Sequence, residues 1–323
     1  MAVISRSSTA ELAVIIVSYN TIDVLRECIE AVYAQCNRLR TEIIVVDNAS
    51  TDGSVDMLAK DFPLVKCIAN TQNLGFGVAN NIGVAAATAP YIMLLNSDAI
   101  MLSDTGDYLV GFMSQHAEVA CVAPRVVLPN GKPQPKVFGY APNAWRVFTQ
   151  SVGLNRLYPQ CDFFGGIDSE YRKGEITDVG WLSGVCLVMR RQDYLKVGGF
   201  DAQFFMYCED IDLCVRLKKH VGKLVLVDVP EVKHYGGASS KTLAAKVRNA
   251  VWQQRHLLII IKASSGQNSW LASTLFITLG LVIRLGVGLA LSPLRGFKHN
   301  ETLQMARCRL ADIVGIYQLK KPQ

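Results

Sequence analysis

Polar side chains follow three apolar runs of the sequence, at the points where buried strands are expected to end. The runs cover residues 12–17, 42–47 and 91–95, and the side chains at their ends are Ser18, Tyr19, Asn20, Asp47, Asn48, Asn96, Ser97 and Asp98. Ligands of open α/β sheets bind beyond the carboxyl ends of the strands. One such set alone is ordinary loop polarity, but three sets on one edge predict a binding site.

Asp98 is a candidate ligand for a divalent cation, Mg²⁺ or Mn²⁺, because it comes two residues after the run MLLN, at the expected edge of the sheet. A carboxylate at a sheet edge can hold a hard cation, which in turn holds a diphosphate. An N-cap for the following helix explains the same aspartate equally well. His234 follows the run LVLVDVP, and a lone histidine is more often structural than a ligand.

A second cluster of carboxylates lies at Glu209, Asp210 and Asp212, next to the aromatic stretch FFMY at 204–207. Carboxylates beside a large apolar group have raised proton affinity, as a general base needs. A helix start with acidic residues favoured by the helix dipole explains Glu209 and Asp210 as well. The spacing leaves both interpretations open.

Other nucleotide-binding chemistries are disfavoured. The glycines of NLGFG at 73–77 do not form GxGxxG, and no Walker pattern is present. These absences argue against a nicotinamide enzyme and against a P-loop NTPase.

The elements that must position these residues alternate between strands and helices, which predicts an α/β fold with a doubly wound, mostly parallel sheet and helices on both faces. Strands are expected at 12–17, 42–47, 65–69, 91–95, 185–189 and 224–227. Helices are expected at 24–33, 77–87 and 210–219, and a further short helix should follow the loop NASTDG and end at Lys60. The proline-rich segment 124–178 predicts long loops around the site.

Charge is unevenly spread along the 323 residues. Residues 1–240 carry 21 Lys and Arg against 25 Asp and Glu, whereas residues 241–323 carry 12 against 2. An acidic body with a basic tail favours contact between the tail and an anionic surface, either a membrane or a nucleic acid. The apolar run in the tail and the acidic body disfavour nucleic acid.

The tail is expected to be helical. Thr242–Lys262 reads as a long basic helix, and Trp270–Leu291 is an apolar run interrupted by Arg284 and followed by Pro293. Because an arginine near the centre is costly in lipid, this run predicts an interfacial or re-entrant helix rather than a span. A buried helix that covers the sheet, or an oligomer contact, explains the same run. The N-terminus has no signal-peptide core. Nine scattered cysteines without a CxxC pair indicate reduced thiols in a cytoplasmic protein.

Six motifs together resemble inverting glycosyltransferases of family two, in the rhamnosyltransferase-like branch. They are VSYN at 17–20, VVDNASTDGS at 45–54, NLGFGVANNIG at 73–83, LNSD at 95–98, WLSGVCLVMRR at 181–191 and GGFDAQFFMYCEDIDLCVR at 198–216. The resemblance covers about residues 12–240 and implies a GT-A fold. Within an expected catalytic domain at 1–240, it implies a nucleotide-binding part at about 12–125 and an acceptor-side part at about 126–240. The charge and the apolar run described above predict the separate basic, apolar helical tail at 241–323.

The resemblance also implies roles for individual residues. Asp210 would be the general base, with Glu209 the next candidate, and Asp98 and His234 would approach the metal and the diphosphate. Asn96 replaces the first aspartate of the family's DxD motif. Trp181 and Gly184 match an acceptor-side motif. The set expected to bind the nucleotide sugar is Ser18, Tyr19, Asp47, Asn48, Asn81, Asn96, Ser97 and Asp98.

The expected activity is transfer of a sugar, best taken as rhamnosyl, from a dTDP- or UDP-linked donor to the hydroxyl of a glycan or lipid-linked acceptor in cell-surface polysaccharide synthesis. The tail would attach the protein peripherally to the inner face of the cell membrane, and an oligomer is left open. The alternative is a non-catalytic nucleotide-sugar-binding module, which would lack a base or a metal ligand.

Overall fold

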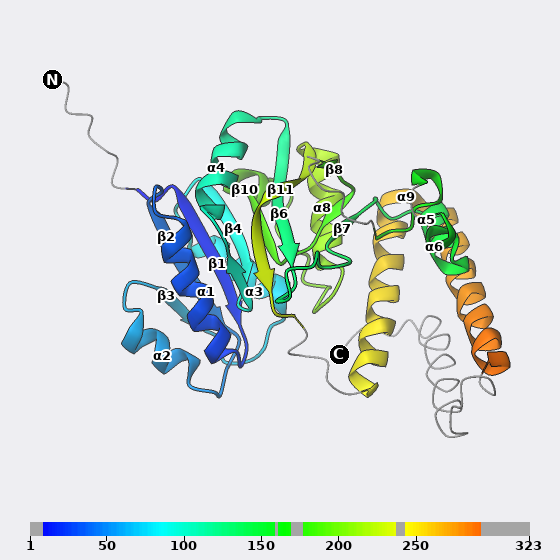
Figure 1. Ribbon diagram of the computed structural model, residues 1–323, viewed down its shortest axis with the longest axis horizontal. Coiled ribbons are helices and arrows are strands. Elements are labelled where there is room, and N and C mark those ends of the chain that lie inside the picture. The colour runs from blue at the N-terminus through cyan, green and yellow to red at the C-terminus, as the bar shows by residue number, and fades with distance from the viewer. Residues whose placement is uncertain (1–8, 159–160, 169–176, 237–242, 292–323) are drawn as a thin grey trace. The chain divides into compact units, whose positions relative to one another are not determined.

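The chain folds into two compact units (Figure 1). The computed structural model describes residues 9–158, 161–168, 177–236 and 243–291. The first unit, here the sheet unit, comprises Met1–Phe138 and Tyr171–Gly236. The second, here the helical unit, comprises Gly139–Glu170 and Gly237–Gln323. The tail residues 292–323 lie outside the described residues.

The sheet unit is built on one sheet of nine strands in the described part of the chain, in the order β3-β2-β1-β4-β10-β6-β11-β5, with β8 paired to β11. The strands are β1 (Leu12–Ser18), β2 (Thr41–Asp47), β3 (Lys66–Ala69), β4 (Tyr91–Asn96), β5 (Ala99–Met101), β6 (Val119–Val127), β8 (Thr177–Asp178), β10 (Cys186–Arg190) and β11 (Lys223–His234). A separate two-stranded ladder joins β7 (Phe138–Gly139) and β9 (Trp181–Leu182).

The expected mostly parallel α/β sheet is confirmed. Strands β3, β2, β1 and β4 are mutually parallel, and β6 is parallel to β11. Strand β10 runs antiparallel between β4 and β6, and β5 and β8 run antiparallel to β11. Buried parallel strands read as continuous apolar runs, which is why Leu12–Ile16 are fully buried and were visible in the sequence.

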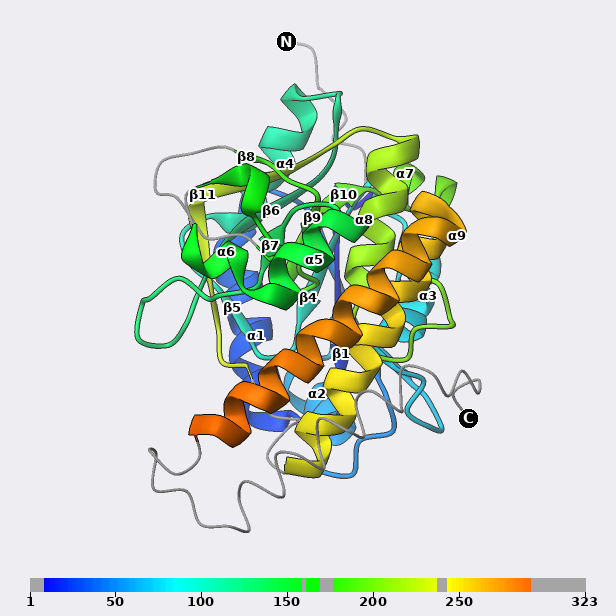
Figure 2. The same cartoon turned by 90° about the vertical axis from the view of Figure 1, so that its right-hand side faces the viewer.

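Helices cover both faces of the sheet. Figure 2 shows α1 and α4 on one side of the strands and α3 and α8 on the other. The helices of this unit are α1 (Ile22–Gln35), α2 (Ser54–Asp61), α3 (Phe76–Ala86), α4 (Thr105–Gln115), α7 (Arg191–Lys196) and α8 (Glu209–His220). Helix α1 buries Leu25, Cys28, Ile29 and Val32, the helical spacing that the sequence predicted.

The helical unit contains structure where long loops were expected, so that expectation is wrong for residues 144–157. Helices α5 (Ala144–Val152) and α6 (Leu154–Leu157) lie there, followed by the 3₁₀ turn η1 (Asp162–Phe164). The Asn143 side chain accepts a hydrogen bond from the Arg146 N–H at 2.9 Å and so begins α5. Gly153, with φ of +84°, ends it. Prolines on both sides of this segment favour loops, and for this reason the sequence did not predict the helix.

The two helices expected in the tail are both present, as the arms of α9 (Leu243–Leu291). Gly266 interrupts the helix with φ of 83° and ψ of 177°, and it separates a first arm, 243–265, from a second arm, 267–291. Figures 1 and 2 show the arms running in opposite directions. No helix in the described ranges is long and apolar enough to cross a membrane.

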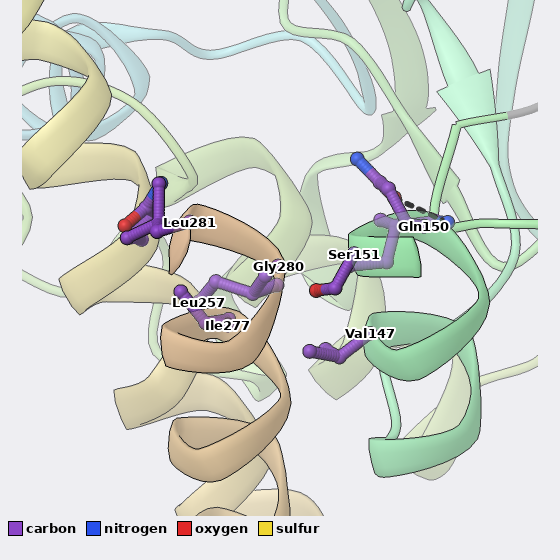
Figure 3. A pocket seen from close by; sticks show the side chains of 9 residues that line it. Val147, Gln150, Ser151, Leu257, Ile277, Gly280 and Leu281 are labelled. Carbon is purple, nitrogen blue, oxygen red and sulfur yellow. Dashed lines mark hydrogen bonds between the residues drawn. The ribbon is translucent and has the colours of Figure 1, made fainter. Parts of the chain in front are cut away.

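The arms of α9 and helix α5 line a cavity of about 90 Å³ that is partly open to solvent (Figure 3). Its lining residues are Val147, Gln150, Ser151, Ile167, Gln254, Leu257, Ile277, Gly280 and Leu281. Gly280 allows the close approach of the second arm, because a Cβ atom there would lie 2.7 Å from the Ser151 backbone oxygen. None of the residues that the sequence selected for the site lines this cavity.

Gly83 sets the distance between α3 and the sheet, which yields a stability prediction. A Cβ atom at Gly83 would lie 2.4 Å from Ile15 Cγ2 and 3.2 Å from Val46 Cγ2. We expect Gly83→Ala to lower the free energy of unfolding by about 1–3 kcal/mol because the core is overpacked. The matched control is Gly111→Ala in α4, where a Cβ atom would meet nothing within 4 Å. The control should stabilise the protein by about 0.5–1 kcal/mol through helix propensity. Urea unfolding measures both, and equal effects of the two substitutions would contradict the packing argument.

Candidate active site

The carboxyl ends of β1, β2 and β4 bring the predicted polar residues together. Ser18 pairs with Asp47, and Val17 pairs with Asn96. The Thr21 hydroxyl lies 3.0 Å from the Ser18 Oγ atom and donates to the Ser97 Oγ atom at 3.1 Å. Thr21, which the sequence analysis did not select, therefore links two of the predicted residues across the edge.

Asp47 presents an unsatisfied acceptor at this edge. Its side chain is almost fully buried, and its Oδ2 atom accepts a hydrogen bond from the Ser50 N–H at 2.8 Å. Its Oδ1 atom is buried without a hydrogen-bond partner among the described residues. A buried acceptor of this kind requires a donor, and a hydroxyl or ring N–H of a bound nucleoside has the right chemistry.

Asn48 holds the neighbouring loops. Its Nδ2 atom donates to the Gly75 carbonyl at 3.2 Å, and its Oδ1 atom accepts from the Asn70 side chain at 2.9 Å. Gly75 has a φ of +82°, and a Cβ atom there would lie 2.4 Å from the Phe205 carbonyl oxygen. Only glycine therefore allows the NLGFG segment to lie directly against the loop that precedes α8.

The two predicted metal ligands, Asp98 and His234, lie together. The His234 Nε2 atom is 3.0 Å from Asp98 Oδ1, and its Nδ1 atom is 2.9 Å from Gln134 Oε1. Burial acts to raise the pKa of Asp98, but the hydrogen bond and charge of His234 outweigh it, so the pKa is lowered. The carboxylate is thus held ionised. Gln134 carries no sequence signal for this contact, because it comes from a segment with no periodicity.

The donor set at this point fits a weakly held divalent cation. Among the described residues no group of three or more His, Cys, Asp or Glu side chains is gathered. Asn96 contributes a neutral amide, whose Nδ2 atom lies 3.4 Å from His234 Nε2. One carboxylate and one imidazole are few ligands, but Mg²⁺ sites commonly take one or two carboxylates and complete their shell with substrate phosphates and water.

Asp210 is fixed beside the same edge by two hydrogen bonds. Its Oδ2 atom accepts from the Gly184 N–H at 3.0 Å, and its Oδ1 atom accepts from the Ile211 N–H at 2.9 Å. Val185, which follows Gly184 in the chain, accepts a hydrogen bond from the Asn96 N–H at 3.0 Å. Asp210 and the LNSD motif are therefore joined through two consecutive residues of one segment.

Glu209 is the more deeply buried member of the acidic pair. Burial, reinforced by the nearby charge of Asp210, raises the pKa of Glu209 to about 8. Burial also raises the pKa of Asp210, although the Gly184 and Ile211 N–H groups oppose the shift. The backbone before α8 is strained, because Tyr207 and Cys208 have φ values of +69° and +67°. Such strain is typical of positions where the chain must aim a functional group.

Three predicted residues lie in other surroundings. The Asn81 side chain donates to the Phe200 carbonyl at 2.8 Å and accepts from the Phe200 N–H at 2.9 Å, so it anchors the loop at residues 198–200, here the GGF loop. Trp181 is only 4% exposed and offers an acceptor little surface. Tyr19, by contrast, is 49% exposed at the end of β1. Their predicted binding roles stay predictions.

The fold is that of solved glycosyltransferases. A mannosyltransferase, PcManGT from Pyrobaculum calidifontis in complex with GDP-Man and Mn²⁺, matches with a TM-score of 0.55 at 17% identity, over 97% of this chain and 89% of that one. S. aureus TarS 1-349 matches with a TM-score of 0.54 at 14% identity, over 95% of this chain and 81% of that one.

The family model for Glycosyl transferase family 2 matches residues 13–175, and the chain belongs to this family. An N-acetylglucosaminyl-diphospho-decaprenol L-rhamnosyltransferase of Mycobacterium tuberculosis (strain ATCC 25618 / H37Rv) is 30% identical over 209 residues, covering 61% of this chain and 67% of the relative. Rhamnosyltransferase WbbL of Escherichia coli (strain K12) is 28% identical over 185 residues, covering 53% of this chain and 65% of the relative. The family expected from the motifs is confirmed.

The raised pKa of Glu209 predicts a pH-dependent gain in stability for Glu209→Gln. The carboxyl ionises near pH 4.5 in the unfolded chain but near pH 8 in the folded one, so the native stability falls as pH rises through this window. Glutamine removes that loss. The variant should be close to wild type near pH 4.5 and more stable by about 4 kcal/mol near pH 7.5. Urea unfolding across this range measures the difference, and a gain that does not grow with pH would show that Glu209 is ionised in the native protein.

Proposed function

We propose that the protein is an inverting glycosyltransferase that transfers a rhamnosyl group from a dTDP- or UDP-linked donor to a hydroxyl of a lipid-linked glycan acceptor. The two relatives named as rhamnosyltransferases support the sugar. The decaprenol in the name of one of them supports a lipid-linked acceptor. The product would enter cell-surface polysaccharide synthesis.

The observation that carries the proposal is the hydrogen bond from Gly184 to Asp210. Each oxygen of the carboxylate accepts one backbone N–H, which fixes the plane of the group and leaves the remaining lone pairs for an acceptor hydroxyl. Asp210 removes the hydroxyl proton while the oxygen attacks the anomeric carbon opposite the departing nucleoside diphosphate. No protein nucleophile takes part, so the anomeric configuration inverts.

Asp98 and His234 would hold a divalent cation, Mg²⁺ or Mn²⁺. When bound, the cation would neutralise the negative charge that grows on the diphosphate leaving group. His234 is oriented for this role by Gln134, as ligating histidines generally are by a partner on the other ring nitrogen. Asp47 would accept a hydrogen bond from the nucleoside through its unpaired oxygen, and Ser18 and Ser97 would line the same pocket.

The protein would act at the inner face of the cell membrane, attached peripherally through the helical part of its tail. The division into a nucleotide-binding part at 12–125, an acceptor-side part at 126–240 and a tail remains part of this proposal. Gly184 and Trp181 would belong to the acceptor side. A non-catalytic nucleotide-sugar-binding module is disfavoured, because Asp98, Asp210 and His234 are all present.

Asp210→Asn separates the base from donor binding. Asparagine keeps the size of the side chain but cannot take a proton, so transfer should fall about 10²–10⁴-fold while the dissociation constant of the nucleoside diphosphate stays unchanged. The matched variant is Glu209→Gln, one residue away, which should keep most of the transfer rate. Rates come from release of nucleoside diphosphate with acceptor present. If the Gln variant is the inactive one, the base is Glu209.

Asp98→Ala tests both the metal and the donor. A screen of nucleotide sugars with and without Mn²⁺ or Mg²⁺ should show metal-stimulated hydrolysis of a dTDP- or UDP-linked deoxyhexose by the wild type. The variant should lose the stimulation and bind Mn²⁺ at least about tenfold more weakly when nucleoside diphosphate is present. Electron paramagnetic resonance of free Mn²⁺ measures this binding without turnover. Equal wild-type activity in excess chelator would refute the metal ligand assignment.

A further inference from the structure

The helical unit exposes an apolar stripe along the second arm of α9. Five residues of this stripe are each between 41% and 63% exposed: Leu271, Leu275, Leu279, Val282 and Ile283. Their spacing of three or four residues places them on one side of the helix. Ile277 and Leu281 on the opposite side are buried and line the cavity against α5 (Figure 3). The stripe is thus the outward face of an arm whose inward face is already packed.

A series of aromatic contacts connects the second arm with α5 and η1. Phe276 packs on Phe148 with ring centroids 5.0 Å apart, Phe148 on Trp145 at 5.5 Å, and Trp145 on Phe163 at 5.0 Å. Phe163 then contacts Phe164, which contacts Tyr158, each at 5.2 Å. Three rings of this series are exposed: Trp145 by 39%, Tyr158 by 52% and Phe163 by 64%. The stripe and these three rings are called the apolar surface below.

The indole of Trp145 is prepared for an apolar environment. Its Nε1–H donates to the Phe163 carbonyl at 2.7 Å. The polar atom is therefore satisfied within the protein, and transfer of the ring out of water leaves no hydrogen bond unmade. Trp and Tyr side chains are enriched where proteins meet the boundary between lipid and water, because their rings suit both phases.

The charge of α9 indicates the partner. Residues 243–291 contain five basic residues and no acidic one: Lys246, Arg248, Arg255, Lys262 and Arg284. Exposed Lys262 lies 5.5 Å from the Trp270 ring, at the start of the second arm. A second copy of the chain would bring a helix of the same positive charge, whereas an anionic lipid leaflet is complementary to that charge.

We propose that the apolar surface of the helical unit inserts into the headgroup region of an anionic phospholipid bilayer. The proposal gives the peripheral attachment named above its contact surface, and it rests on that part of the proposed function. The second arm lies in the plane of the interface with its outward side chains in the acyl boundary. The basic residues of α9 attract the anionic headgroups.

The first experiment measures sedimentation of the full chain with vesicles that contain no lipid-linked sugar acceptor. The wild type should bind vesicles of phosphatidylglycerol and phosphatidylcholine, and bind pure phosphatidylcholine less. The double substitution Leu275→Ser, Leu279→Ser should weaken binding at least about tenfold, because two apolar anchors are lost. The matched control is Leu64→Ser, which removes a leucine that is 88% exposed in the sheet unit. Equal weakening by the control, or none by the double variant, would overturn the proposal.

A second experiment reports contact directly. Brominated phospholipid should quench the tryptophan fluorescence of the wild type, and Trp145→Phe should lower this quenching while retaining binding. Light scattering of the free protein tests whether a second copy of the chain, instead of a membrane, covers the apolar surface. A dimer that the double leucine variant dissociates would make the apolar surface a protein interface and refute the proposal.

Measurement of donor hydrolysis distinguishes failure of the proposed glycosyl transfer from failure of the proposed membrane surface. The double leucine variant should hydrolyse nucleotide sugar at the wild-type rate, which also shows that it is folded. If hydrolysis and transfer are absent from all variants and the wild type while vesicle binding follows the expected order, the proposed reaction fails and the membrane surface stands. If transfer to a water-soluble acceptor proceeds but no variant or wild-type protein binds vesicles, the membrane surface fails alone.

Discussion

The insertion of one antiparallel strand into the sheet is the constraint on which the site depends. Strand β10 lies between β4 and β6, and the residues just before it serve two partners in succession. Val185 accepts from the Asn96 N–H, and Gly184 donates to the Asp210 carboxylate. The LNSD motif at the end of β4 and the Asp210 carboxylate at the start of α8 are thereby both hydrogen-bonded to the two residues that precede β10. A shift of β10 by one residue would turn every side chain to the other face and separate the two.

Close backbone approaches hold the loops around the site. Gly77 lies where a Cβ atom would be 2.9 Å from the Phe200 Cβ atom, and the Phe200 and Phe76 rings meet edge to face at 5.7 Å. The Arg216 guanidinium donates to the Val197 and Gly199 carbonyls at 2.7 Å each, and it pairs with Asp212. The GGF loop is therefore tied to α8 from one side and to α3 through Asn81 from the other. These ties restrict the movement of the GGF loop relative to α8, whose first turn carries Asp210.

Much of the sheet could be predicted from the sequence, because buried parallel strands are continuous apolar runs with polar residues at their ends. The strands that carry Ser18, Asp47 and Asn96 were visible for this reason. The contact of Asp98 with His234 followed only from the family resemblance, since 136 residues separate them in the chain. Gln134 and Thr21 could not be found, because they act through pairings that no local pattern records. Asn81 was assigned to the nucleotide from its motif, whereas its hydrogen bonds hold a loop 119 residues away.

Because α9 is interrupted at Gly266, the number of residues after this glycine determines which side chains of the second arm face outward. Gly266 has a backbone conformation that is essentially restricted to glycine, so the reversal of the chain is tied to one position. Each residue added to an α-helix turns everything beyond it by about 100°. A single insertion between Gly266 and Leu271 would rotate the outward leucines toward α5 and carry Ile277 and Leu281 into solvent. Divergent sequences that keep this hairpin should therefore tolerate exchange of one apolar residue for another along the second arm, but should conserve the number of residues that separates the glycine from the stripe.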